Sequence, residues 1–231
     1  MLYTMLIAHL LGDYVLQSNS LARWKARSLV GGLVHGGIVT VTTLTCAGLV
    51  APSWWPFALL IGLTHTAIDL VRTRFLRTTN PGWELIWYLV DQLVHVAVIT
   101  ATVIWSDVSL QSQSVLADSR LSVYVIGYLL LLNPAWIFFR FAVRGVCGPD
   151  AVSLMCAGAK PEAMMERVLI ASCVLAGQFC LVPLVVLLRR LASIRVQEIE
   201  VGVLTRPTDH WLATALSVSL AVGVGLTLRM V

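Results

Sequence analysis

Apolar residues form seven long runs along the chain, and the short segments between them hold most of the charged residues. Each run approaches the roughly 20 residues that an α-helix needs to cross a bilayer. The first run has neither the basic start nor the small-residue cleavage site of a signal peptide, so we expect it to stay in place as a helix. The pattern predicts membrane-spanning helices at residues 2–17, 28–51, 54–71, 83–105, 121–141, 168–189 and 211–229.

The fifth run is interrupted in its interior by the dipeptide Asn133-Pro134. Proline has no backbone N–H to donate, and its ring collides with the carbonyl one turn earlier in a helix. A continuous straight helix is therefore disfavoured at this position. We expect a kink or a break near residue 133.

Basic residues occur in alternate connections between the runs. The connections after the first, third and fifth runs carry several Lys and Arg, whereas the connection after the second carries no charge. The positive-inside rule then predicts an inner (cytoplasmic) membrane protein with its N-terminus outside. The connection after the sixth run breaks the alternation, with Arg189, Arg190, Arg195 and Arg206. Either this connection is an exception, or the segment LLRRLASIRVQEIE is an interfacial amphipathic helix and the helix count is wrong by one.

The composition agrees with a membrane protein. Hydrophobic residues make up 58% of the chain and charged residues only 12%, against about 25% charged residues in soluble domains. We therefore expect an all-α fold, a polytopic integral-membrane bundle of about seven helices. The net charge of +4 is small, and the basic residues lie at turns between the apolar runs. This distribution indicates that they anchor the protein on anionic lipid, and we expect no nucleic-acid partner. The five cysteines form no CxxC pair, so we predict no disulfide framework and no thiolate metal site.

Histidine and aspartate recur in one pattern within the first four runs. The first and third runs carry His-x3-Asp, and the fourth carries the reverse order, Asp-x3-His. Residues four apart share one face of a helix. Because the fourth helix should run antiparallel to the first and third, the reversal places all three aspartates on the cytoplasmic side of their histidines. We expect seven side chains to meet in one layer: His9, Asp13, His35, His65, Asp69, Asp91 and His95.

A divalent metal ion is the simplest partner for this set. A charged residue at membrane depth costs about 3 kcal/mol even on lenient scales, so three carboxylates need compensation. All seven residues are candidate metal ligands, with zinc favoured as one or two ions and manganese, magnesium or iron compatible. The carboxylates would be bridging ligands, or one would be a general base. The alternatives are separately satisfied core groups and a proton or cation pathway. We assign the catalytic role to Asp13, Asp69 and Asp91, and substrate binding to Gln17, Lys25 and Gln92.

No P-loop, GxGxxG, HExxH or GxSxG motif is present, so an enzyme of this kind would depend on its metal. The leading hypothesis is a metal-dependent hydrolase on the cytoplasmic side, acting on a lipid or hydrophobic substrate, phosphorylated substrates and prenyl diphosphates included. The alternatives are a prenyl-diphosphate lyase or cyclase with the same metal site, a divalent cation or proton transporter, and a structural subunit. Residues 1–105 would form the functional core and residues 106–231 accessory helices.

Four segments, AHLLGDYVLQS, LVHGG, LTHTAIDLVR and WYLVDQLVHVAV, resemble a bacterial membrane family catalogued as domain of unknown function 3307. The resemblance covers about residues 5–100, and AGAKPEAMMERVLI and AGQF are similar to the family pattern further on. LLRRLASIR departs from that pattern. The resemblance implies a membrane protein but no activity. A looser similarity, in the style of the motifs, is to inner-membrane metal-dependent hydrolases.

Overall fold

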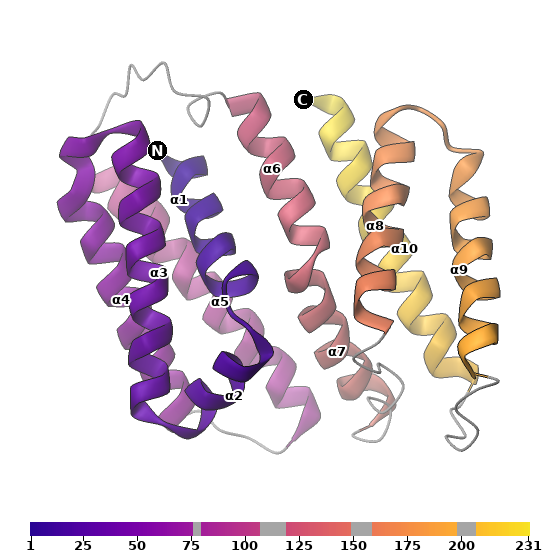
Figure 1. Ribbon diagram of the computed structural model, residues 1–231, viewed down its shortest axis with the longest axis horizontal. Helices are drawn as coiled ribbons and strands as arrows, with labels where there is room; N and C mark the ends of the chain where they lie inside the picture. The colour runs from indigo at the N-terminus through magenta and orange to yellow at the C-terminus, as the bar shows by residue number, and fades with distance from the viewer. Residues whose placement is uncertain (76–79, 107–118, 149–158, 198–206) are drawn as a thin grey trace. The chain divides into compact units, whose positions relative to one another are not determined.

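The computed structural model describes residues 1–75, 80–106, 119–148, 159–197 and 207–231, and this part of the chain contains helices and no strand (Figure 1). The chain divides into two compact units. One comprises Met1–Thr79 and Ile86–Leu129, and the other Asn80–Leu85 and Leu130–Val231. The helices are α1 Leu2–Leu10, α2 Asn19–Arg27, α3 Leu29–Val50, α4 Trp55–Phe75, α5 Pro81–Trp105, α6 Ser119–Leu131, α7 Asn133–Cys147, α8 Ala159–Leu175, α9 Leu181–Gln197 and α10 Pro207–Met230.

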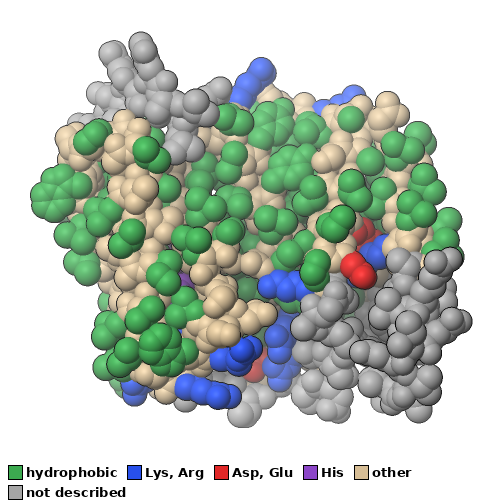
Figure 2. Space-filling model, viewed as in Figure 1, with side chains coloured by type: hydrophobic (Ala, Val, Ile, Leu, Met, Phe, Trp, Pro, Cys, Tyr) green, Lys and Arg blue, Asp and Glu red, His purple; other side chains and the backbone are tan. Residues whose placement is uncertain are grey.

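Four helical segments among the described residues are long and apolar enough to cross a membrane. They are Leu29–Val50, Pro52–Phe75, Gly82–Trp105 and Leu212–Met230, and the bent pair α6 and α7 makes a fifth if it counts as one span. Their outer faces are apolar, with residues such as Val41, Leu63, Leu93 and Ile104 well exposed. Figure 2 shows hydrophobic side chains spread over the visible face. The described residues are all-helical, and four of the helices could span a membrane, which suggests a membrane protein. The expected seven spans are not confirmed.

The start of the chain differs from the single expected helix at 2–17. Residues Leu2–Val15 form a helix that is shorter than a full span. After it, Asn19–Arg27 forms a separate helix, α2, with no buried residue. The Ser18 hydroxyl caps α2 by accepting a hydrogen bond from the Leu21 amide at 3.2 Å, as serine does at helix N-termini. Polar positions that read as a loop in the sequence therefore form an extra, amphipathic helix.

The expected break in the fifth run is confirmed. Helices α6 and α7 meet at an angle of 41°, and Pro134 stands in the first turn of α7. The carbonyl groups freed at the break find a buried cation, because Arg167 of α8 donates Nε to the Leu131 carbonyl at 2.7 Å and a second nitrogen to that of Leu132 at 3.4 Å. The Arg167 side chain, only 1% exposed, therefore satisfies these two carbonyls inside the second unit.

The expected sixth helix, 168–189, is wrong because a turn divides it. The backbone of Gly177 has a φ of 75°, a conformation that glycine adopts at no steric cost. The amide of Gln178 bonds the Cys173 carbonyl at 2.8 Å, and that of Gly177 bonds Val174 at 3.0 Å. This is the Schellman arrangement that ends a helix. Helices α8 and α9 consequently form an antiparallel hairpin (Figure 1).

The hairpin also accounts for the exception among the basic connections. Arg189, in the middle of α9, forms an ion pair with Glu166, in the middle of α8. The two helices of the hairpin therefore lie side by side at this level. Arg189, Arg190 and Arg195 thus belong to α9 and not to a connection, and the segment LLRRLASIRVQEIE continues α9 as far as Gln197. Arg206 lies outside the described residues.

In the first unit, α3 and α4 pack closely along their lengths. Glycine on each helix faces threonine on the other. A Cβ added to Gly36 would stand 2.2 Å from the Thr66 Oγ1, and one added to Gly62 would stand 2.5 Å from that of Thr40. Small residues of this kind let membrane helices approach closely. The close approach brings the inner faces of α3 and α4, which carry His35 and His65, to the same place.

Candidate metal centre

All seven residues expected to meet do lie together in the first unit. His9 comes from α1, Asp13 from the turn after it, and the rest from α3, α4 and α5. Each is buried, and the most exposed of them, Asp13, is only 7% accessible. Helical periodicity and the reversed motif on α5 explain the convergence. The structure therefore gathers these side chains, whereas their roles as ligands stay a prediction.

The first motif does not lie on a regular α-helix. Residues Leu11–Val15 form a π-helical turn, in which the amide of Leu16 bonds the Leu11 carbonyl at 2.8 Å. Such turns contain one extra residue and often occur at functional sites. Gly12 belongs to this turn, and a Cβ there would stand 3.1 Å from Val39 of α3. The wide turn shifts Asp13 from the position that the spacing of four implied, and Gly12 lets α3 approach it.

One group that can hold a metal ion consists of Asp13, His35, His65 and Asp69. The Nε2 atom of His35 is 3.1 Å from an oxygen of Asp13 and 3.2 Å from one of Asp69. The Nε2 atom of His65 is 3.5 Å from the same Asp69 oxygen and 4.0 Å from Asp13. Nitrogen and oxygen ligands bind zinc at about 2.0–2.2 Å. Two ligands of one ion then stand roughly 3–4 Å apart, so this spacing suits one ion.

A second group consists of Asp69, Asp91 and His95 and shares Asp69 with the first. The Nδ1 atom of His95 is 2.7 Å from the backbone carbonyl of Asp91. A carbonyl only accepts, so Nδ1 carries the proton and Nε2 presents a lone pair. Metal-binding histidines are commonly held in this way. Neither Nε2 of His95 nor Oδ1 of Asp91 has a hydrogen-bond partner.

His9 belongs to neither group. Its Nε2 lies 3.2 Å from the Gln92 carbonyl oxygen, to which it donates. Its ring stacks on that of His95, with centroids 5.3 Å apart. The Gln92 amide nitrogen in turn reaches Asp91 at 3.1 Å and Asp13 at 3.4 Å. Gln92, expected to bind substrate, thus connects His9 to two of the carboxylates.

Two cationic side chains reach into the cluster from the basic end of these helices. The Lys25 ammonium of α2 is 2.6 Å from an Asp69 oxygen and 3.7 Å from Asp13, and it donates to Gln17 at 3.2 Å. Arg72 donates to Asp91 at 2.9 Å. A Cβ on Gly31 would stand 2.6–2.7 Å from the backbone of Trp24 and Lys25, so this glycine lets α2 lie close against α3.

The contact of Arg72 was not predicted from the sequence, because the basic residues after the third run were interpreted only as anchors on anionic lipid. A signal was present, because Arg72 stands three residues after Asp69 and seven after His65. That spacing places the three residues on one helix face. In contrast, Arg74 of α4 and Arg27 of α2 are exposed, as residues that anchor a protein on lipid are expected to be.

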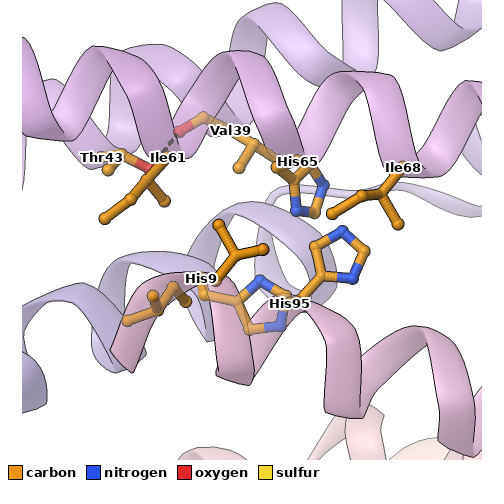
Figure 3. Close-up of a pocket in the computed structure, with 9 residues that line it drawn as sticks. His9, Val39, Thr43, Ile61, His65, Ile68 and His95 are labelled. Atoms are coloured by element: carbon orange, nitrogen blue, oxygen red, sulfur yellow. Dashed lines mark hydrogen bonds between the residues drawn. The ribbon is translucent and has the colours of Figure 1, made fainter. Parts of the chain in front are cut away.

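A small cavity lies beside three of the imidazoles (Figure 3). His9, His65 and His95 lie toward one end of it in this view. The only other polar side chain among the described residues of the lining is Thr43, whose hydroxyl donates to the Val39 carbonyl at 2.8 Å. Apart from the imidazoles the cavity presents an apolar wall, which includes Val39, Ile61, Ile68, Val98 and Ile99.

A family model described as a protein of unknown function, DUF3307, matches residues 1–123, just over half of the 231-residue chain. The chain belongs to this family. The match covers α1 to α5 and every residue of the two groups that could hold a metal ion. No curated protein and no solved structure matches the chain. The looser similarity to metal-dependent hydrolases finds no support in these comparisons.

Proposed function

We propose that this DUF3307 protein is a metal-dependent membrane enzyme, a hydrolase of a lipid or another hydrophobic substrate. The observation that carries the proposal is a pair of imidazole nitrogens, Nε2 of His65 and Nε2 of His95. Both residues are buried, and neither atom has a hydrogen-bond partner. A buried polar atom without a partner costs about 1–3 kcal/mol. Two of them beside three buried carboxylates are accounted for by metal ions that the lone pairs bind.

The two groups of ligands support a site for one or two ions. Asp69 belongs to both groups, as a bridging carboxylate between neighbouring metals would. Asp13 would complete the first site and Asp91 the second. Oxygen and imidazole ligands together suit zinc, manganese or iron, and we favour zinc because four histidines are present. Magnesium, which prefers oxygen ligands, fits this set less well.

Metal-assisted hydrolysis follows from what these groups can do. When bound, a metal ion would supply a hydroxide nucleophile at neutral pH and polarisation of an ester or phosphoryl oxygen. The Asp91 Oδ1, which has no hydrogen-bond partner, is placed to accept the proton of the attacking water. Asp13 and Asp69 would then serve as ligands only. The neighbouring cavity has room for about one water molecule, so the hydrophobic part of a substrate would lie outside it.

A transport pathway is the less favoured alternative, because polar side chains would have to continue through the other half of the helices. Four threonines of α3 are polar side chains that such a path could use. Each of their hydroxyls donates at 2.7–2.8 Å to a carbonyl of its own helix: Thr40, Thr42, Thr43 and Thr45. Hydroxyls bound in this way have their donors occupied, which supports a pocket open to one side.

The test is the metal content of the detergent-purified protein, measured by mass spectrometry. We expect about one or two ions per chain in the wild type, as the ligand groups allow. We expect the ions to be lost in His65→Ala and in Asp91→Ala. The matched control is His210→Ala, because His210 lies in the first turn of α10, in the second unit.

The same preparations are then heated with and without chelator. A metal held at 100 times its dissociation constant stabilises a protein by about 2.7 kcal/mol. The wild type and His210→Ala should therefore lose thermal stability on chelation, whereas the two cluster variants should not respond. A wild-type protein that is folded and holds no metal would overturn the proposal.

A further inference from the structure

The arrangement of Lys25 and Arg72 indicates what the metal site binds. Each cation contacts one of the two ligand groups. Lys25 is 2.6 Å from an oxygen of Asp69, the carboxylate shared by both groups, and Arg72 is 2.9 Å from an oxygen of Asp91. The three carboxylates of the cluster and these two cations leave a formal charge of −1 when the histidines are neutral. The two side chains therefore act as counter-charges of the metal-free site.

Entry of a metal reverses this balance. One divalent ion would raise the formal charge of the same groups to +1, and two ions would raise it to +3. Each ion would also take up carboxylate oxygens that are now paired with Lys25 and Arg72. Two mostly enclosed cationic side chains would then be left beside an excess of positive charge. Such a state is costly within a membrane unless an anion neutralises it.

We propose that the ligand of the metal-loaded site is a phosphate group, held by the metal together with Lys25 and Arg72. The inference rests on the proposed metal site and goes further by naming the chemical class of the substrate. Phosphate suits the arrangement because it carries up to two charges and offers several oxygens to separate donors. Arginine and lysine are the two side chains most used to hold it.

The positions of the other basic residues support this choice. Arg23 bonds the hydroxyl of Ser20 on its own helix at 3.2 Å. Arg27 and Arg74 are exposed. In contrast, Lys25 has a side chain that is 11% exposed and Arg72 one that is 27% exposed. The two are thus mostly enclosed yet open at one side, where a head group would enter from the basic end.

The test is equilibrium binding to purified protein with and without its metal. The probes are inorganic phosphate, dioctanoyl phosphatidic acid, and dioctanoyl phosphatidylcholine as the control lipid without a phosphomonoester. We expect the phosphomonoester to bind only to the metal-loaded protein. Lys25→Met and Arg72→Met should each weaken binding roughly tenfold, because each removes a charged hydrogen bond. The matched controls Arg27→Met and Arg74→Met should stay within about twofold.

The two lipid arms identify the source of the phosphate. Phosphatidic acid that binds at least tenfold more tightly than inorganic phosphate indicates a lipid phosphomonoester, and equal affinity indicates free phosphate. Phosphatidylcholine that binds as well as phosphatidic acid overturns the proposal. Binding that is independent of metal, or unchanged in both variants, overturns it as well.

Metal content, measured in every variant, separates this inference from the proposed function. We expect Lys25→Met and Arg72→Met to keep their metal, since the two cations oppose its entry. Loss of metal in these variants, with melting temperatures unchanged, would make the cations structural and overturn the inference. Variants that do not fold are replaced by Lys25→Gln and Arg72→Gln, which keep a polar donor. Metal in the wild type without phosphate binding overturns the inference alone, whereas absence of metal overturns both.

Discussion

Adding one methyl group to either of two neighbouring glycines of α3 should distinguish the effect of helix packing on stability from that of helix propensity. Gly36 and Gly37 are neighbours on α3 with opposite surroundings. A Cβ on Gly36 would stand 2.2 Å from Oγ1, 2.5 Å from Cγ2 and 2.8 Å from Cβ of Thr66, whereas a Cβ on Gly37 meets nothing within 4 Å. We expect Gly36→Ala to destabilise the protein and Gly37→Ala to leave it as stable or more so.

The size of the destabilisation in Gly36→Ala depends on whether the Thr66 side chain or the two helices can move aside. The Thr66 hydroxyl donates to the Gly62 carbonyl at 2.8 Å. Rotating the side chain exchanges one crowded atom for another, because both branches are too close. The helices must therefore separate by about 1 Å to restore ordinary contact distances. Overpacking of this kind costs about 1–3 kcal/mol, while alanine in place of glycine favours a helix by up to about 1 kcal/mol.

The two variants should therefore differ by about 2 kcal/mol. For a chain of this size that is about 4–8 °C in melting temperature. The eight tryptophans allow unfolding to be followed by intrinsic fluorescence in detergent. Metal affinity should also fall in Gly36→Ala, because a wider gap moves His35 from Asp69, now 3.2 Å away. Equal melting temperatures for the two variants would refute the packing argument.

Three further predictions address other contacts. Gly31→Ala should push α2 away, because its Cβ would stand 2.6 Å from the backbone of Trp24; trypsin should then cleave within α2 faster than in the wild type, and unchanged cleavage would contradict this. Arg167→Met should cost about 1–3 kcal/mol for each carbonyl left without a partner, and the exposed Arg140→Met should change the melting temperature little. Gly177→Ala should cost about 1–2 kcal/mol, since L-residues are strained at a φ of 75°; a melting temperature equal to that of the wild type would show that the turn does not depend on glycine.

Much of the fold class was accessible from local patterns. Length and apolarity are properties of a continuous segment, so they predict α3, α4, α5 and α10 without knowledge of their partners. The break before Pro134 is equally local, because proline acts on the turn that contains it. The turn at Gly177 was missed because apolar residues continue through it. Hydropathy does not register a positive φ, and one residue in that conformation reversed the chain.

The sequence predicted which residues meet in the candidate site, but it did not predict how they are arranged there. The reversed order of Asp91 and His95, together with the antiparallel course of α5, determines that the histidines and aspartates share a layer. Which of them form a group depends on rotation and spacing. Asp13 lies in the π-helical turn Leu11–Val15, and His9 lies outside both groups that could hold a metal ion.

The sequence by itself determined an all-helical membrane protein that carries four histidines and three aspartates at one depth. Only the tertiary structure decided that Asp69 belongs to two ligand groups and that Lys25 and Arg72 reach them. The physical reason is the distance along the chain over which each sequence signal acts. Periodicity and hydropathy act over one helix, whereas a lysine reaches a carboxylate on another helix only where backbones approach closely. That approach depends on Gly31 beneath α2 and on Gly36 between α3 and α4, where a missing side chain determines the distance.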